Sequence, residues 1–242
     1  MTDIEIPWTD EPRVAFDLET TGRDPLEARI VTASLVYIDP DGTKTDEKEW
    51  LLDPGVEIPE GAAAIHGVTT ERARAEGVPA ADGVREIFEA LDVASGTGRP
   101  IVGHNLAYDL TVVLSELARH GLPGNVPALC PIIDSYVLDK AADKYRAGKR
   151  TLSAATAHYG IDLPAELAHT SAADCYASER LATAIAKKYP ELNVPATRLH
   201  KWQIGWAAQQ AASLQAFKRR KDPTVVIDGS WPVRVLEEAV DA

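Results

Sequence analysis

The sequence has only two cysteines, Cys130 and Cys175, which lie far apart in apolar segments. Disulfide frameworks need more cysteines, so that class is excluded and a reducing compartment is expected. No apolar run approaches the roughly 18 residues of a membrane span, and the N-terminal MTDIEIPWTD lacks the basic and apolar regions of a signal peptide. We therefore expect a cytoplasmic protein without a membrane partner.

Positive charge is also scarce. Lysine and arginine number 25 against 37 aspartates and glutamates, which gives a formal net charge of −12. This balance argues against broad, non-specific binding of nucleic acid. It leaves open an enzyme that meets phosphates through metal ions and a local basic patch.

What the sequence does contain is a series of strand and helix patterns typical of an α/β domain. Early segments rich in β-branched residues predict three strands with short, antiparallel-type connections, at 13–19, 29–39 and 43–52. Later segments predict helices at 77–94, 107–121, 135–146, 150–160 and 171–190, and strands at 99–105 and 128–134. We expect a mixed β-sheet flanked by helices, in one domain over 12–189.

Residues 190–242 form a C-terminal extension that differs from this domain. A helical stretch holds Trp202 and Trp206, the basic run FKRRK follows at 217–221, and VVI at 225–227 is a candidate strand. We expect a largely helical segment that either packs on the domain or binds a partner.

Two carboxylates lie where the first predicted strand ends, in VAFDLETTG (14–22). Asp17 and Glu19 share one side of an extended chain, because residues i and i+2 point to the same face. A hard divalent cation prefers such oxygen ligands. A solvated strand end would carry the same residues, so the pair alone leaves both interpretations open.

Two further acids and a histidine lie in later segments. Asp109 ends GHNLAYD (103–109), in the first turn of a predicted helix, where the helix dipole favours a negative charge. Asp174 lies among alanines in HTSAAD (169–174), and burying an unpaired carboxylate costs roughly several kcal/mol. A helix-start acid explains each aspartate, and metal coordination would also explain Asp174.

These segments, in this order, resemble the DEDDh family of 3′–5′ exonucleases, also called DnaQ-like, which includes proofreading subunits of DNA polymerases, RNase T and oligoribonucleases. FDLETTG is similar to the first motif and GHNLAYD to the second, and the spacing between His169 and Asp174 is that of the histidine subclass. IHGVT (65–69) resembles the family's His-Gly loop. The resemblance covers roughly 13–189 and implies an RNase H-like fold.

The resemblance implies a metal-dependent hydrolase that shortens nucleic acid from its 3′ end. Two Mg²⁺ or Mn²⁺ ions would be held by four carboxylates, Asp17, Glu19, Asp109 and Asp174. His169 would be the general base, since its ordinary pKa of about 6.5 lies near working pH. The likeness to proofreading-type enzymes favours single-stranded DNA over RNA as substrate, and a role in DNA replication or repair.

The resemblance also implies contacts with the substrate. Leu18, Thr20 and His66 would contact the 3′-terminal nucleotide, with Thr20 acting through its backbone. The alternative for His66 is a residue that structures its loop and does not bind the nucleotide. The extension at 190–242 would either cover the nuclease core or dock a DNA polymerase.

A basic cluster at 140–150 precedes the third motif. We interpret its Lys149 and Arg150 as contacts for the phosphates of the strand, although a charged run is also typical of a solvated surface.

Three alternatives remain at this point. An RNA exonuclease similar to RNase T or the oligoribonucleases shares the motifs. A catalytically silent nucleic-acid-binding module would share the fold, but silent relatives lose one or more of the catalytic residues that are all present here. A phosphatase similar to the haloacid dehalogenases starts with a comparable strand end, but that family has a second aspartate where Glu19 stands.

Overall fold

The centre of the molecule is a six-stranded sheet formed by β1 (Arg13–Thr20), β2 (Ile30–Ile38), β3 (Lys44–Asp53), β4 (Val78–Pro79), β5 (Ile101–Gly103) and β6 (Ile132–Asp134). The structure is a computed structural model that describes residues 5–161 and 170–234. The strand order is β4-β3-β2-β1-β5-β6. β1 and β3 run antiparallel to β2, whereas the pairs β1–β5, β5–β6 and β3–β4 are parallel. The predicted mixed sheet is therefore confirmed.

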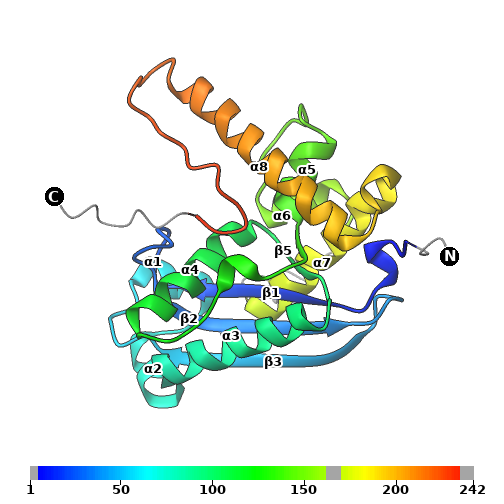
Figure 1. Ribbon diagram of the computed structural model, residues 1–242. Coiled ribbons are helices and arrows are strands. Elements are labelled where there is room, and N and C mark those ends of the chain that lie inside the picture. The colour runs from blue at the N-terminus through cyan, green and yellow to red at the C-terminus, as the bar shows by residue number, and fades with distance from the viewer. Residues whose placement is uncertain (1–4, 162–169, 235–242) are drawn as a thin grey trace.

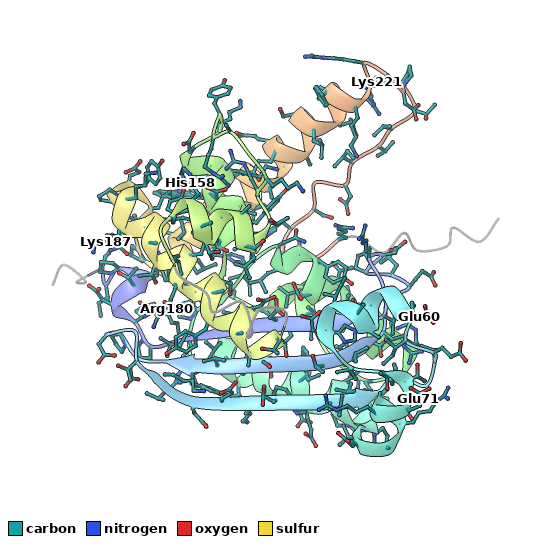
Figure 2. All side chains as sticks on the ribbon, turned by 180° about the vertical axis from the view of Figure 1, so that it is seen from behind. Glu60, Glu71, His158, Arg180, Lys187 and Lys221 are labelled. Carbon is teal, nitrogen blue, oxygen red and sulfur yellow. The ribbon has the colours of Figure 1, made fainter. Side chains whose placement is uncertain are left out.

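Helices cover both faces of this sheet. In the described ranges they are α1 (Glu60–His66), α2 (Thr70–Glu76), α3 (Ala80–Gly96), α4 (Leu106–Arg119), α5 (Ser135–Ala142), α6 (Leu152–His158), α7 (Ser171–Lys188) and α8 (Ala196–Lys218). Short 3₁₀ turns lie at Trp8–Asp10, Val126–Ala128 and Pro190–Leu192. α3 and α4 lie on the face of the sheet that is in front in Figure 1. α7 crosses the opposite face, which is in front in Figure 2.

The alternation of side chains along β1 assigns each residue to one of these faces. Phe16 is buried in the core cluster that includes α3 and α4, while Ala15 packs with Cys175 of α7. Because alternate residues of a strand share a face, Asp17 and Glu19 continue the row of Ala15. The two acids therefore lie on the side of the sheet that α7 covers.

Helix α8 covers the outer edge of β6. His200 accepts the backbone N–H of Ile132 through Nδ1 at 3.1 Å. Gln203 accepts the N–H of Asp134 at 2.7 Å and donates to the carbonyl of Ile132 at 2.9 Å. These side chains satisfy polar groups that an edge strand would otherwise leave unpaired.

The distal end of α8 projects away from the sheet, and the chain then returns along 219–234, which we call the return segment (Figure 1). Figure 2 labels Lys221 at the distal tip. The division of the chain into a domain at 12–189 and an extension at 190–242 stays a prediction.

Most predicted elements are confirmed, with ends that differ by a few residues. The strand predicted at 225–227 is wrong: these residues form no strand, and their groups pair locally. The carbonyl of Val225 accepts Nε–H of Arg219, and the N–H of Ile227 donates to Gln215. The residues 60–66 and 70–76, for which no helix was predicted, form α1 and α2 on either side of Gly67, which caps α1 with φ 74°.

Both cysteines are free thiols, with Cys175 buried and Cys130 half-buried. Within residues 5–161 and 170–234, no helix combines the length and the apolar character needed to cross a membrane.

Candidate active site

Three carboxylates converge where the end of β1 meets the start of α7. Asp17, Glu19 and Asp174 each offer one oxygen, and these oxygens lie within 4.8 Å of one another. All three residues are half-buried. Oxygen donors gathered in this way fit a hard divalent cation.

Several hydrogen bonds fix the start of α7 over the sheet. The side chain of Thr170 caps the helix by accepting a backbone N–H of the first turn. Ser171 Oγ lies 2.7 Å from Ser34 Oγ of β2, and Cys175 donates its S–H to the carbonyl of Ser34 at 3.3 Å. Asp174, in the first turn of this anchored helix, is thereby held over β1.

Asp109 approaches the end of β1 from the other face of the sheet. It lies in the first turn of α4, after Asn105, which adopts a left-handed conformation with φ 65°. The Asp109 carboxylate is buried and accepts the backbone N–H of Leu18 at 3.2 Å. Leu18 lies between Asp17 and Glu19, so all four predicted carboxylates gather at the end of β1. Asp17, Glu19 and Asp174 form the close cluster, and Asp109 accepts the backbone N–H between the first two.

The concentration of negative charge raises the pKa of these carboxyl groups. Burial raises the pKa of Asp17 well above its ordinary value, and the charges of Asp109, Asp174 and Glu19 add to the rise. Burial, followed by repulsion from Asp174, raises the pKa of Glu19 to about 7. Burial also raises the pKa of Asp109, against the lowering effect of its backbone hydrogen bonds.

Among the residues that the structure describes, no lysine, arginine or histidine forms an ion pair with Asp17, Glu19 or Asp109. Buried carboxylates without a cationic side chain are unfavourable unless they coordinate a metal. The donor set and its electrostatics therefore fit divalent metal ions.

His169, the predicted general base, lies outside the described residues. Its role stays a prediction.

Tyr108 is a site residue that the sequence reasoning missed, although it lies within GHNLAYD. Its hydroxyl bonds to Thr20 Oγ1 and to the carbonyl of Gly22, and so ties the start of α4 to the end of β1. Burial raises its pKa, and the positive charge of Arg234 acts in the opposite direction. The predicted contact residue Thr20 is thus held at the rim of the carboxylate cluster.

His66 lies beside the carboxylates, at the end of α1. With Glu19 and Thr170 it lines a cavity of about 320 Å³. Its Nδ1 accepts the N–H of Val68 at 3.2 Å, and burial lowers its pKa. Its Nε2 has no hydrogen-bond partner among the described residues. A neutral imidazole with a buried, unpaired nitrogen is suited to a polar group of a ligand.

Leu18, the third predicted contact for the terminal nucleotide, is buried in the core cluster on the α4 side of the sheet. The structure therefore places its side chain on the face opposite to Asp17, Glu19 and Asp174, and its backbone N–H donates to Asp109.

The basic cluster at 140–150 is largely folded around a buried acid. Arg146 and Arg150 both form ion pairs with Asp139, at 2.8 and 2.7 Å. Arg150 also donates to the carbonyls of Asp139 and Asp143. These contacts favour a structural role for Arg150, while Lys149 is exposed. Phosphate binding by either residue stays a prediction.

A fold and a site of this kind define a nuclease, and comparison with protein families agrees. The family model RNase_T, described as an exonuclease, matches residues 14–182, well over half of the chain. The chain therefore belongs to this exonuclease family. The alternative of a phosphatase similar to the haloacid dehalogenases is thereby set aside.

Curated relatives include bacterial proteins named for DNA polymerase III. A DNA polymerase III subunit epsilon-like protein of Rhodobacter capsulatus is 28% identical over 167 residues, which cover 68% of this chain and 22% of the relative. A PolC-type DNA polymerase III of Lacticaseibacillus paracasei is 27% identical over 186 residues, covering 74% of this chain and 12% of the relative. The chain thus spans less than a quarter of the length of either protein.

Solved structures with the same fold include two DNA-bound exonucleases. Escherichia coli exonuclease I in complex with a dT13 oligonucleotide has a TM-score of 0.61 and 20% identity, covering 75% of this chain and 42% of that one. Exonuclease X in complex with 5′ overhanging duplex DNA has a TM-score of 0.53 and 20% identity, covering 77% and 98%. This likeness confirms the fold.

Proposed function

We propose that the chain is a metal-dependent 3′–5′ exonuclease that hydrolyses phosphodiester bonds at a single-stranded 3′ end, with DNA favoured over RNA. The observation that carries this proposal is the convergence of Asp17, Glu19 and Asp174, with Asp109 bonded to the backbone beside them. Membership of the exonuclease family supports hydrolysis of nucleic acid as the reaction. The four carboxylates would supply the metal ligands for this hydrolysis.

The four carboxylates would hold two Mg²⁺ or Mn²⁺ ions. Bound divalent ions would acidify a coordinated water and stabilise charge on the phosphate. Asp109 holds the backbone of β1 in place through its bond to Leu18, which keeps Asp17 and Glu19 in position. His169 would accept the proton of the attacking water at an imidazole nitrogen.

The 3′-terminal nucleotide would lie between the carboxylates and His66. The unpaired Nε2 of His66 would bond to the base or sugar, and Thr20 would approach the nucleotide through its backbone. The Leu18 side chain is buried on the α4 side of the sheet, so a contact of Leu18 with the nucleotide would involve its backbone. The hydroxyl of Tyr108 holds Thr20 in place for this contact.

DNA is the proposed substrate because the matched relatives are named for DNA polymerase III and two structural neighbours are complexes with DNA. The same names support a role in DNA replication or repair and a DNA polymerase as partner. Two free thiols support the reducing cytoplasm as the compartment.

The test is incubation of the protein with 5′-labelled single-stranded DNA, duplex DNA and single-stranded RNA, each with Mg²⁺, Mn²⁺ or EDTA. We expect ladders that shorten from the 3′ end, only with metal, and fastest on single-stranded DNA. Faster shortening of RNA would favour the RNA exonuclease alternative. Binding of DNA without any hydrolysis would favour the catalytically silent module.

A further inference from the structure

The return segment (219–234) is fixed to the core close to the candidate active site. Trp231 is buried, its ring lies 5.0 Å from that of His200, and its Nε1–H donates to Asp134 at 3.4 Å. Three residues further on, the backbone N–H of Arg234 donates to Thr111 Oγ1 at 2.9 Å. Figure 1 shows the segment running from the tip of α8 back towards α4.

This path brings Arg234 to the end of α4 that faces the carboxylates. Thr111, its hydrogen-bond partner, lies within one helical turn of both Tyr108 and Asp109. Tyr108 contacts Thr20 at the end of β1, and Asp109 accepts the N–H of Leu18. Arg234 is therefore an arginine that the extension adds at the rim of the site.

A pocket of about 160 Å³ lies between the return segment and helices α4, α5 and α8, and Asn105, Lys140 and Arg234 are among its lining residues. Because β1, β5 and β6 are parallel, their carboxyl ends lie along one edge of the sheet. Asn105 follows β5 at this edge, and Asp134 ends β6 there. The pocket therefore adjoins the edge at which β1 presents its carboxylates.

The charged groups of this pocket favour an anion. Among the described residues, no carboxylate forms an ion pair with Lys140 or Arg234. The two acids of the lining already accept hydrogen bonds: buried Asp134 accepts three N–H groups, and Asp228 accepts the backbone N–H and the hydroxyl of Ser230. An anion entering the pocket would meet Lys140 and Arg234, which form no ion pair with a carboxylate of the described residues.

We propose that this pocket is a subsite for the nucleic-acid backbone, in which Arg234 and Lys140 bind a phosphate on the 5′ side of the scissile bond. The inference rests on the proposed exonuclease function. A protein with a net charge of −12 repels an approaching polyanion, and cations at the rim of the site offset that repulsion. The planar guanidinium of Arg234 suits two phosphate oxygens, while Lys140 adds a point charge.

The test compares two substrates in Arg234→Gln and Lys140→Gln. A 5′-labelled oligothymidylate has phosphates upstream of the cleaved bond, whereas thymidine 5′-(p-nitrophenyl phosphate) has only the phosphodiester that is cleaved. We expect KM for the oligothymidylate to rise about tenfold in Arg234→Gln, since hydrogen bonds to charged groups contribute most. A smaller rise is expected in Lys140→Gln. The dependence of log KM on log salt should become less steep by about 0.7 for each variant.

The p-nitrophenyl ester should be hydrolysed at the wild-type rate by both variants, because it has no phosphate to place in the pocket. Arg234→Lys should recover part of the affinity, because lysine keeps the positive charge but cannot donate the paired hydrogen bonds of a planar guanidinium. The matched control is Lys187→Gln, which removes one positive charge at the exposed far end of α7 (Figure 2).

An oligothymidylate KM that rises no more in Arg234→Gln than in Lys187→Gln would overturn the subsite and leave the exonuclease proposal intact. Equal losses on both substrates, with a lowered melting temperature, would show a structural role for Arg234 and would overturn the subsite as well. Failure of the wild-type protein on both substrates would overturn the exonuclease proposal itself.

Discussion

At the scale of single residues, the site is defined by a cluster of carboxylates at the end of one strand. Asp17 and Glu19 are placed by the alternation of β1, and Asp174 by the capped start of α7. Their repulsion makes the metal-free protein less stable whenever the acids are ionised. The arrangement of oxygen donors fits divalent cations.

The stability of the metal-free protein should fall as pH rises. Glu19 has a folded-state pKa of about 7 against an ordinary value of 4.5, so the folded chain holds a proton that the unfolded chain has lost. The stabilising effect of this proton is full below about pH 4.5 and is lost as pH rises through about 7. Thermal unfolding in EDTA should therefore give a lower melting temperature at pH 8 than at pH 5.

Addition of Mg²⁺ should raise the melting temperature more at pH 8 than at pH 5, because ionised carboxylates bind the ion more tightly. Glu19→Gln in EDTA should show a weaker pH dependence than the wild type. If Glu19→Gln kept the pH dependence of the wild type, the loss of stability with rising pH could not be assigned to Glu19.

At the scale of secondary-structure elements, the notable feature is the way α8 protects β6. Gln203 is fully buried and bonds to both the N–H of Asp134 and the carbonyl of Ile132. β6 supports the pocket beside the active site, so this contact links the extension to the nuclease core.

Replacement of Gln203 by leucine should destabilise the protein by about 2 to 4 kcal/mol, because it leaves two buried backbone groups unpaired. Urea unfolding measures this loss. The control Gln209→Leu lies on the same helix at an exposed position and should change stability by less than about 0.5 kcal/mol. Equal effects of the two substitutions would contradict the role of Gln203.

The secondary structure of the sheet could be predicted from sequence because its strands have strong patterns. β1 and β2 are apolar and β-branched, and the turn at 39–42 marks the end of β2. α1 and α2 were missed because the segments EGAAAIH and TERARAE are too short to show a clear helical period. The helix α6 is equally short, and it was predicted together with Gly160, the glycine that follows it. Residues 225–227 were assigned to a strand on composition. In the structure their backbone groups bond instead to the side chains of Arg219 and Gln215.

The candidate site could be predicted in part. The common face of Asp17 and Glu19 followed from strand geometry, but their meeting with Asp109 and Asp174 could be expected only from the resemblance to known nucleases. The basic cluster at 140–150 could not be interpreted from charge alone, because the sequence does not show that buried Asp139 holds two of its arginines. The position of Arg234 depends on the path of the return segment, which has no sequence signature.

At the scale of the whole molecule, the proposed function requires a chain with a net charge of −12 to bind a polyanion. Two features would make this binding possible for an acidic protein. The acids of the site would hold cations, and the extension adds Arg234 at the rim of the site. Long-range repulsion by the remaining acids would limit non-specific binding and favour strands that engage the site itself.

The most direct test of the central claim is single-turnover cleavage of 5′-labelled single-stranded DNA in Mg²⁺ by Asp17→Asn, compared with the control Asp92→Asn at an exposed position of α3. The account predicts that Asp17→Asn folds as well as the wild type but loses about 4 kcal/mol of transition-state stabilisation, or about a thousandfold in rate. Asp92→Asn should cleave at the wild-type rate. Cleavage by Asp17→Asn at the rate of Asp92→Asn would contradict the account.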